Sequence, residues 1–213
     1  MTEGPSHLAA TATAYDAVAA LYADLFRNAL DDQPLDRAPL DVFAELVRTT
    51  GGGPVAELGC GPGYVAAYLR KQGLDVFGLD LSPVMIDLAR EAYPELRFEV
   101  GSMDALDLAD GTLRGIVSWY SLIHTPPQDL PAYLGEFRRV LAPGGHLLIG
   151  FCESEGEPVT PFDHKVTTAY RWPIDELAAL AHAADFTEIG RMLREPQAEG
   201  QRFRQGRLLM RRQ

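Results

Sequence analysis

Apolar side chains in the first part of the chain recur at intervals of three and four residues, which is the spacing of one face of a helix. Over residues 8–30 they include Leu8, Tyr15, Val18, Tyr22 and Phe26. A polar run at residues 31–33 and a proline at position 34 end this pattern. We therefore expect one N-terminal helix or a broken pair, followed by a second helix over residues 40–49 that stops at three glycines and a proline.

From residue 55 onward, short apolar segments alternate with segments of helical spacing. The expected strands are residues 55–58, 75–80, 96–101, 115–119 and 146–152, and the expected helices are residues 64–72, 83–92 and 130–141. Strands joined through helices make right-handed crossovers and pair in parallel. The pattern predicts an α/β fold, in which a mostly parallel sheet is covered by helices on both faces.

The rhythm changes after residue 152. Residues 153–168 are polar and include two prolines, which predicts a long excursion rather than a short loop. A helix over residues 174–184 and two strands near residues 186–193 and 201–210 complete the expected fold, and these strands lack an intervening helix, so antiparallel pairing is expected. A chain of 213 residues suits one well-buried domain, residues 1–213.

Composition and charge narrow the function classes. The formal net charge of −11 argues against an extended nucleic-acid surface, because most of the chain would repel a polyanion. Seven arginines lie between Arg191 and Arg212, but they are spaced like outward positions of strands, so a nucleic-acid role there is the weaker alternative. No apolar run approaches the roughly 20 residues of a membrane span, and the N-terminus lacks a secretory signal pattern, which favours a cytoplasmic enzyme or binding protein. Two cysteines, Cys60 and Cys152, form neither a metal cluster nor a disulfide framework, so we expect free thiols and no metal site.

The turn after the first expected strand is the clearest chemical signal. Glycine occupies Gly59, Gly61 and Gly63, and an acid, Glu57, lies two places before the first of them. Alternate glycines allow positive φ and let a ligand approach the backbone closely. The dinucleotide fingerprint G-x-G-x-x-G fails, because Tyr64 stands where its third glycine belongs. A nucleotide-like ligand is therefore expected, with pyrophosphate binding the weaker interpretation.

Residues 57–63 resemble the first motif of the class I S-adenosylmethionine-dependent methyltransferases, and later segments match that family in order over most of the chain. The resemblance implies a Rossmann-like fold with seven strands, of which the last is antiparallel. It implies S-adenosylmethionine as the cofactor, S-adenosylhomocysteine as its product and a small-molecule acceptor, with no nucleic-acid or membrane partner. The oligomeric state stays open.

The resemblance also implies which residues hold the cofactor. Asp80, at the end of the second strand, would bind the ribose hydroxyls, and the alternative is a helix-capping aspartate. Asp104 would accept from the adenine amino group beside Met103, unless it is a turn residue. The segment from Trp119 would face the methionine moiety. The complete implied set is Tyr15, Tyr22, Glu57, Gly59, Gly61, Gly63, Asp80, Leu81, Met85, Ser102, Met103, Asp104, Trp119 and Ser121.

Two peripheral segments complete the implied site. Residues 1–35 match a helical lid that closes over the cofactor with Tyr15 and Tyr22, although core tyrosines would give the same pattern. Residues 153–172 match an acceptor-side excursion, in which His164, Tyr170 and Trp172 are candidate substrate contacts. Four acids in this excursion, Glu153, Glu155, Glu157 and Asp163, would favour a cationic substrate if they line a pocket, and the alternative is a solvated loop.

Methyl transfer from a sulfonium is an in-line displacement, so the protein mainly positions the reactants, an effect that contributes about 7 to 11 kcal/mol. A hydroxyl acceptor must also lose a proton. His124 follows the fourth strand closely and titrates near neutral pH, so it is the candidate base and substrate contact. The alternative is a histidine that orders the loop before Pro126.

The sequence thus favours a small-molecule methyltransferase that acts on oxygen or nitrogen, for example in secondary metabolism. Two other classes remain. A catalytically inactive S-adenosylmethionine-binding sensor or partner subunit would keep the same glycine turn. A nicotinamide-dependent oxidoreductase would share the sheet and an acid such as Asp80, but the glycine spacing disfavours it.

Overall fold

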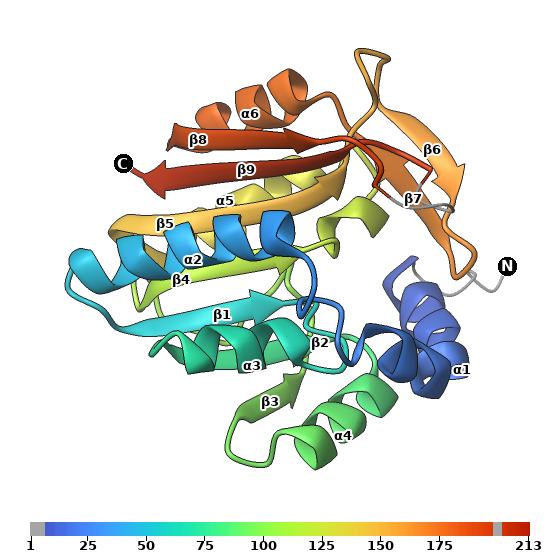
Figure 1. Ribbon diagram of the computed structural model, residues 1–213. Coiled ribbons are helices and arrows are strands. Elements are labelled where there is room, and N and C mark those ends of the chain that lie inside the picture. The colour runs from blue at the N-terminus through green and yellow to red at the C-terminus, as the bar shows by residue number, and fades with distance from the viewer. Residues whose placement is uncertain (1–6, 198–201) are drawn as a thin grey trace, which may run out of the picture.

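A computed structural model describes residues 7–197 and 202–213, and a seven-stranded sheet in the order β3-β2-β1-β4-β5-β9-β8 lies at its centre (Figure 1). The strands of this sheet are β1 Pro54–Leu58, β2 Asp75–Asp80, β3 Arg97–Val100, β4 Leu113–Trp119, β5 Leu141–Cys152, β8 Phe186–Arg194 and β9 Gln205–Arg212. The helices are α1 His7–Phe26, α2 Pro34–Thr49, α3 Tyr64–Lys71, α4 Pro83–Ala92, the short 3-10 helix η1 Leu122–His124, α5 Leu130–Val140 and α6 Ile174–Ala183. A separate hairpin pairs β6 Thr160–Asp163 with β7 Thr168–Arg171.

The strand directions confirm the predicted α/β architecture. Strands β3, β2, β1, β4 and β5 run parallel, and β9 runs antiparallel to both of its neighbours, β5 and β8. The connection from β8 to β9 lacks a helical pattern in the sequence, so it has no crossover that would make the two strands parallel. The fold is a Rossmann-like, mostly parallel sheet whose last strand is antiparallel.

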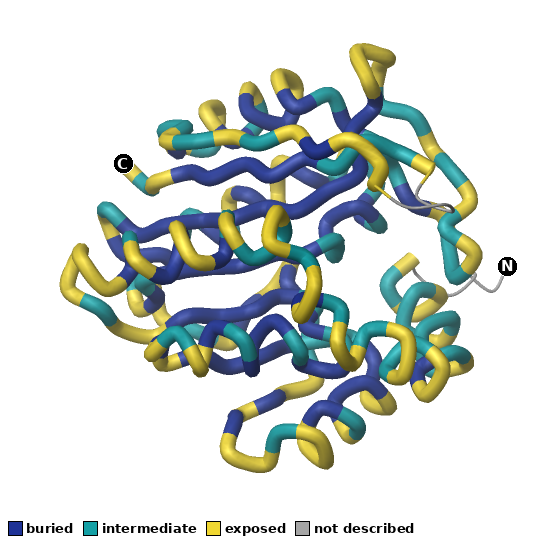
Figure 2. Tube along the Cα trace, viewed as in Figure 1, coloured by how far each residue is buried: buried dark blue, intermediate teal, exposed yellow. Residues whose placement is uncertain are grey.

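Helices cover both faces of the sheet, and the sheet separates the hydrophobic core into two clusters. Successive residues of β5 illustrate the division: Leu147 packs in the cluster that contains α5 and α6, and Leu148 packs in the cluster that contains α2, α3 and α4. This follows from the period of two in a strand, which sends neighbouring side chains to opposite faces. Figure 2 shows the result, with buried strands between helices whose outer sides are exposed.

Several element boundaries differ from the prediction. Helix α1 ends at Phe26, before the predicted residue 30, and α2 begins at Pro34 rather than residue 40, because proline suits the first turn of a helix. The excursion after β5 contains the β6–β7 hairpin, which the sequence pattern missed. Position 201 of the predicted last strand lies outside the described residues, and β9 begins at Gln205.

The parallel strands point toward a single edge of the sheet, and α1 and the β6–β7 hairpin stand on either side of that edge (Figure 1). Open α/β sheets bind ligands at this edge, outside the carboxyl ends of the strands. Within the described parts of the chain, the search for a helix long and apolar enough to cross a bilayer finds none.

Packing in the α5 cluster gives a first prediction. Phe137 is fully buried on α5, so Phe137→Ala should lower the free energy of unfolding by about 3 to 5 kcal/mol. Leu25 of α1 is 68% exposed, so Leu25→Ala should change the free energy of unfolding by less than about 0.5 kcal/mol. Urea denaturation measures both values, and equal effects of the two substitutions would contradict this description of the core.

Candidate functional site

The turn between β1 and α3 is built from three glycines with positive φ: 72° at Gly59, 51° at Gly61 and 84° at Gly63. A Cβ atom on Gly59 would lie 2.2 Å from Cβ of Ser121, and one on Gly63 would lie 2.7 Å from the ring of Phe98. At Gly61 the nearest atom would be 3.9 Å away, in a tyrosine ring on α1. Gly59 and Gly63 are therefore required by close packing as well as by φ, whereas Gly61 leaves room for a ligand.

Backbone bonds attach this turn to the end of β2. The N–H groups of Gly59 and Cys60 both donate to the carbonyl oxygen of Leu79, at 2.7 and 3.0 Å. The hydroxyl of Ser121 donates to the carbonyl of Leu58 at 2.5 Å, which attaches the end of β1 to the segment after β4. The ends of three neighbouring strands are thus fixed relative to one another.

Asp80 lies at the end of β2 with its carboxylate beside this turn. One oxygen accepts from the N–H of Gly61 at 2.8 Å, and the other accepts from the N–H of Ser82 at 2.9 Å. Each oxygen keeps acceptor capacity for a further donor. Burial raises the pKa of Asp80, although the two backbone bonds oppose the shift.

The resemblance implies that Glu57 holds the cofactor, but its side chain is directed to α3. Its side chain is buried, and it accepts a hydrogen bond of 2.7 Å from the N–H of Ala66 in the first turn of α3. Burial raises the pKa of Glu57 well above its ordinary value. Glu57 therefore joins β1 to α3 and does not line the cavity described next.

A cavity of about 80 Å³ lies at the carboxyl edge of the sheet, under α1. The expected residues that line it are Tyr15, Tyr22, Gly59, Gly61, Asp80, Leu81, Met85, Ser102, Met103, Trp119, Ser121 and His124. The expected residues absent from its lining are Glu57, Gly63, Asp104, His164, Tyr170 and Trp172. The sequence thus predicts most of the residues that line this cavity.

Helix α1 closes the cavity. Its side chains fill space there, and the volume is well below the roughly 300 to 1,000 Å³ of most ligand sites. Asp16 attaches the helix to α4, because its carboxylate accepts from the hydroxyl of Ser82 at 2.5 Å and from the N–H of Val84 at 3.4 Å. Ser82 is itself the N-cap of α4, and its hydroxyl accepts from Met85. The residue that caps α4 is therefore Ser82 rather than Asp80.

The loop after β3 forms another wall. Ser102 and Met103 line the cavity, whereas Asp104 is exposed and its carboxylate accepts from the hydroxyl of Ser102. The geometry shown here is that of a turn aspartate.

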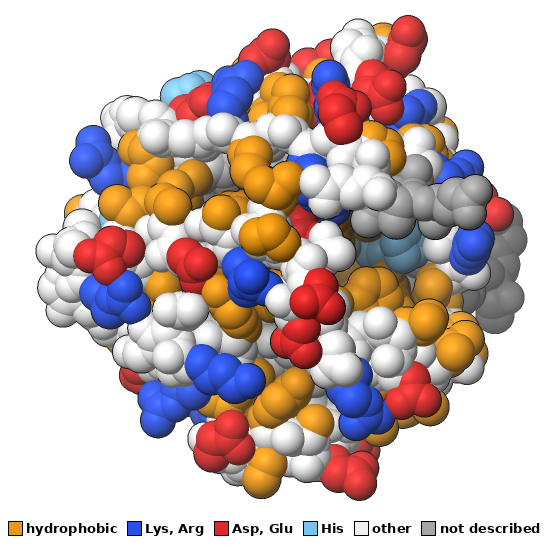
Figure 3. All heavy atoms as spheres, in the orientation of Figure 1, with side chains coloured by type: hydrophobic (Ala, Val, Ile, Leu, Met, Phe, Trp, Pro, Cys, Tyr) orange, Lys and Arg blue, Asp and Glu red, His pale blue; other side chains and the backbone are white. Residues whose placement is uncertain are grey.

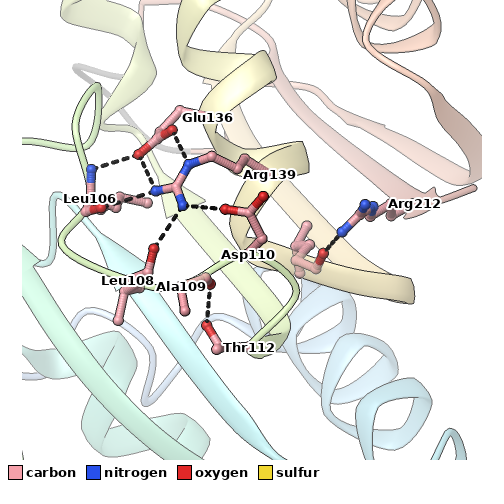
Figure 4. A network of polar contacts seen from close by, with 9 residues as sticks. Leu106, Leu108, Ala109, Asp110, Thr112, Glu136, Arg139 and Arg212 are labelled. Atoms are coloured by element: carbon pink, nitrogen blue, oxygen red, sulfur yellow. Dashed lines mark hydrogen bonds and ion pairs between the residues drawn. The ribbon is translucent and has the colours of Figure 1, made fainter.

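A network on α5 holds the rest of this loop in place (Figure 4). Glu136 accepts from the N–H of Leu106 at 2.7 Å. Arg139 donates to the carbonyl oxygens of Leu106 and Leu108 at 3.0 and 2.7 Å, and it pairs with Asp110 at 2.7 Å. Helix α5, on one face of the sheet, therefore positions the loop that carries Met103.

His124 lies at the end of η1 and bridges the two segments that flank the edge. Its Nδ1 lies 3.0 Å from the carbonyl oxygen of Thr168 on β7, so Nδ1 carries the proton and donates it. Nε2 is then the acceptor, and it receives a hydrogen bond of 2.7 Å from the hydroxyl of Tyr15 on α1. Burial lowers the pKa of His124 to about 4, with a smaller effect from His164, so the imidazole is neutral at neutral pH.

A second cavity, of about 450 Å³, shares a wall with the first, formed by Tyr22, Trp119 and Tyr120. His164 lines this second cavity, and the centroid of its ring lies 5.1 Å from that of His124. Tyr170 and Trp172 line neither cavity. Of the three candidate substrate residues in the excursion, only His164 reaches a cavity.

The acids of the excursion do not form one wall. Glu153 is buried and pairs with Arg204 at 2.7 Å, and Glu155 and Glu157 are exposed. Asp163 alone among the four lines the second cavity. This arrangement fits the solvated-loop interpretation better than an acid-rich pocket.

Tyr120 is a site residue that the sequence analysis missed. It has a φ of +58°, which is unfavourable for a residue with a large side chain, and it lines both cavities. The hydroxyl of Tyr120 accepts a hydrogen bond of 2.6 Å from Arg207, which is buried with its guanidinium 4.3 Å from the ring of Trp119. The only signal in the sequence was its position directly after the fourth strand.

Metal ligands do not gather in this region: among the residues that the structure describes, no three His, Cys, Asp or Glu side chains are placed to hold an ion.

Part of the chain matches a known protein family. The family described as "Methyltransferase domain" matches residues 55–145, which run from β1 into β5. The malonyl-(acyl-carrier protein) O-methyltransferase of Pectobacterium atrosepticum is 36% identical over 116 residues, which are 49% of this chain and 45% of that protein. The chain spans about half the length of the curated relatives it matches.

Solved structures share the fold over nearly the whole chain. The cyclase SpnF matches with a TM-score of 0.78 at 18% identity, covering 98% of this chain and 97% of its own. The 1,6-didemethyltoxoflavin-N1-methyltransferase of Burkholderia thailandensis, solved with S-adenosylhomocysteine, matches with a TM-score of 0.67 at 24% identity, covering 99% and 93%. These similarities confirm the fold.

The low pKa of His124 predicts a pH dependence of stability. In the unfolded chain the group binds a proton below about pH 6.5, whereas in the folded chain it does so only below about pH 4. The unfolded state binds more protons in this window, so stability falls as the pH falls through it, by up to about 3 kcal/mol. His124→Gln should lose less stability than the wild type between pH 7 and pH 4 in urea denaturation. Parallel pH curves for the two proteins would show that His124 is not buried as described.

Proposed function

We propose that this chain is a class I S-adenosylmethionine-dependent methyltransferase and that it transfers a methyl group from S-adenosylmethionine to an oxygen or nitrogen of a small molecule. The observation that carries the proposal is the carboxylate of Asp80, oriented by the N–H groups of Gly61 and Ser82 on the wall of the cavity at the carboxyl edge. A carboxylate in this place suits the cis-diol of a ribose.

The residues along the cavity fit the parts of this cofactor in order. Asp80 ends β2, which lies between β3 and β1 in the sheet, and it would hold the ribose. Ser102 and Met103, on the loop after β3, would flank the adenine. The Gly59–Gly61 turn, with Trp119 and Ser121 after β4, would face the methionine moiety. Asp104 would reach the adenine amino group only after leaving its contact with Ser102.

Helix α1 is proposed to act as a lid, within residues 1–35. Leu8, Thr11, Tyr15 and Tyr22 of this helix line the cavity, whose volume of about 80 Å³ is too small for a nucleoside, so a nucleoside would enter only when α1 shifts outward. The contact of Asp16 with Ser82 lies at the N-terminus of α4, where the lid would remain attached during such a shift.

S-adenosylmethionine supplies a methyl group activated by the positive charge on its sulfur. The chain supplies position: its closed edge excludes water and holds the two reactants in line. For a hydroxyl acceptor, Nε2 of His124 would take the proton after Tyr15 has moved away, while Thr168 keeps the imidazole in the required tautomer. His164, in the acceptor-side segment 153–172, lies beside His124 and would contact the acceptor.

We also infer a cytoplasmic location, which the two free thiols Cys60 and Cys152 support.

The direct test is turnover. The purified chain is incubated with methyl-labelled S-adenosylmethionine and a metabolite extract, and labelled small molecules are identified by mass spectrometry. A methylated product supports the proposal. Binding of S-adenosylmethionine without any product would favour the alternative, a sensor or partner subunit that keeps the cofactor site.

The ribose role of Asp80 gives a quantitative prediction. Asp80→Ala removes a charged acceptor, so the affinity for S-adenosylhomocysteine should fall about 10- to 100-fold, as expected for hydrogen bonds to a charged group. Asp75→Ala is the matched control, because Asp75 is exposed at the opposite end of the same strand. Calorimetric titration measures both, and an unchanged affinity in Asp80→Ala would contradict the assignment.

The proposed base gives another prediction. Once an acceptor with a hydroxyl group is known, His124→Gln should lower its turnover by about 10²- to 10⁴-fold, the usual contribution of a positioned base. The affinity for S-adenosylhomocysteine should stay within about threefold, because the imidazole accepts from the lid rather than holding the cofactor. Turnover within a few-fold of the wild type would leave His124 with a structural role only.

A further inference from the structure

Two rows of aromatic rings extend from the proposed reaction site along the second cavity. The first row follows α1: the ring centroids of Tyr15 and Tyr22 are 5.8 Å apart, and Tyr22 stacks on Phe26 at 4.3 Å. Phe26 in turn stacks on Tyr64 of α3 at 6.0 Å. Tyr22, Phe26 and Tyr64 line the second cavity, so one wall is a continuous aromatic surface.

The second row belongs to the hairpin and the segment before β9. It begins at His124, whose ring lies 5.4 Å from that of Tyr15 and 5.1 Å from that of His164. The ring of His164 lies 6.0 Å from that of Phe162, which lies 4.9 Å from that of Phe203. His164, Phe162 and Phe203 all line the cavity. Figure 3 shows histidine atoms at the bottom of a hollow with hydrophobic side chains beside it.

Cationic side chains gather where the second row ends. The guanidinium groups of Arg171 and Arg202 lie 4.5 and 5.0 Å from the ring centroid of Phe203. Arg202 and Lys165 line the cavity. The lining of the second cavity includes three cationic side chains, Lys165, Arg194 and Arg202, and two acidic ones, Asp36 and Asp163, whereas the chain as a whole has a formal net charge of −11.

The carboxylates on the same wall are already engaged. Asp163 accepts from the N–H of Lys165 within the hairpin turn at 2.7 Å. Asp36 accepts from the buried guanidinium of Arg207 at 2.6 Å. A cationic acceptor would therefore meet guanidinium groups at this end of the cavity, whereas an anionic one would meet complementary charge.

We propose that the second cavity binds the methyl acceptor, and that this acceptor is a planar aromatic compound with a carboxylate or similar anionic substituent. This inference rests on the proposed function. The aromatic ring lies between the two rows, where flat π surfaces stack favourably. The anionic group faces Arg202, and the hydroxyl or amino group that receives the methyl lies toward His164, whose ring is 5.1 Å from that of His124 in the first cavity. A cavity of about 450 Å³ has room for one or two fused rings.

The test uses three probes of the same shape and different charge: para-hydroxybenzoate, its neutral amide para-hydroxybenzamide, and the cation para-hydroxybenzylamine. The full chain is first titrated with S-adenosylhomocysteine, and each probe is then titrated calorimetrically into the saturated protein. We expect para-hydroxybenzoate to bind at least tenfold more tightly than the amide, and the amine to bind most weakly. An amide or amine that binds as tightly as the benzoate overturns the inference.

Two variants locate the recognition. Arg202→Gln should weaken benzoate binding three- to tenfold and leave amide binding within twofold, because it removes charge but little of the wall. Phe203→Ala should weaken both, because it removes a ring. Arg97→Gln is the matched control and should change the binding of neither probe. Arg97 belongs to β3, at the opposite edge of the sheet from β9 and β8, and it lies 4.2 Å from the ring centroid of Phe77. If Phe203→Ala fails to fold, the Arg202 comparison still decides.

The failures are distinguishable. A protein that does not bind S-adenosylhomocysteine contradicts the proposed function itself. A protein that binds S-adenosylhomocysteine and shows no preference for the benzoate, or whose preference is the same in Arg202→Gln as in the wild type, keeps the proposed function and overturns the inference about the acceptor.

Discussion

The rest of the site depends on the turn that leads from β1 into α3. The chain must reverse there while the ends of β2 and β4 stay close, and a Cβ atom at Gly59 would collide with Ser121. Glycine avoids that collision because it has no Cβ atom, and it also permits the positive φ found at Gly59, Gly61 and Gly63. Bonds to Leu79 and Asp80 hold the turn against β2. Because the turn fixes where three strands end, it also fixes the positions of the acid, the small residues and the aromatic wall around the cavity.

His124 connects α1 and the β6–β7 hairpin to this edge of the sheet. Its two ring nitrogens bond to opposite sides, one to the hairpin through Thr168 and the other to α1 through Tyr15. Burial lowers the pKa of His124 and keeps its imidazole neutral, and the tautomer is set by the carbonyl that accepts from Nδ1. In the proposed function, an outward shift of α1 would take the hydroxyl of Tyr15 away from Nε2 and leave that nitrogen available to an acceptor.

Arg207 supports the wall that the two cavities share. The guanidinium lies against the rings of Trp119 and Tyr120, and it bonds to the Tyr120 hydroxyl and to Asp36. These contacts hold Tyr120 at a backbone conformation that a tyrosine in a loop would rarely adopt. A buried arginine paired with a carboxylate is a costly element, and here it keeps an aromatic wall in place between two cavities.

From the sequence we could predict the α/β architecture, the glycine turn after the first strand and the place of Asp80 at the end of the second strand. Strand and helix periodicity are local, and a glycine-rich turn after a buried strand has few conformations. It did not reveal that Glu57 binds α3, that Asp104 is exposed, or that residues 160–171 form a hairpin, since each depends on the surroundings that a side chain meets after folding. Only the folded structure shows that Tyr15, His124 and Thr168 form one hydrogen-bonded chain. It also shows that rings from α1, the hairpin and the segment before β9 surround a second cavity. The physical reason is that these segments lie far apart in the chain and meet only because the parallel strands bring their loops to one edge of the sheet.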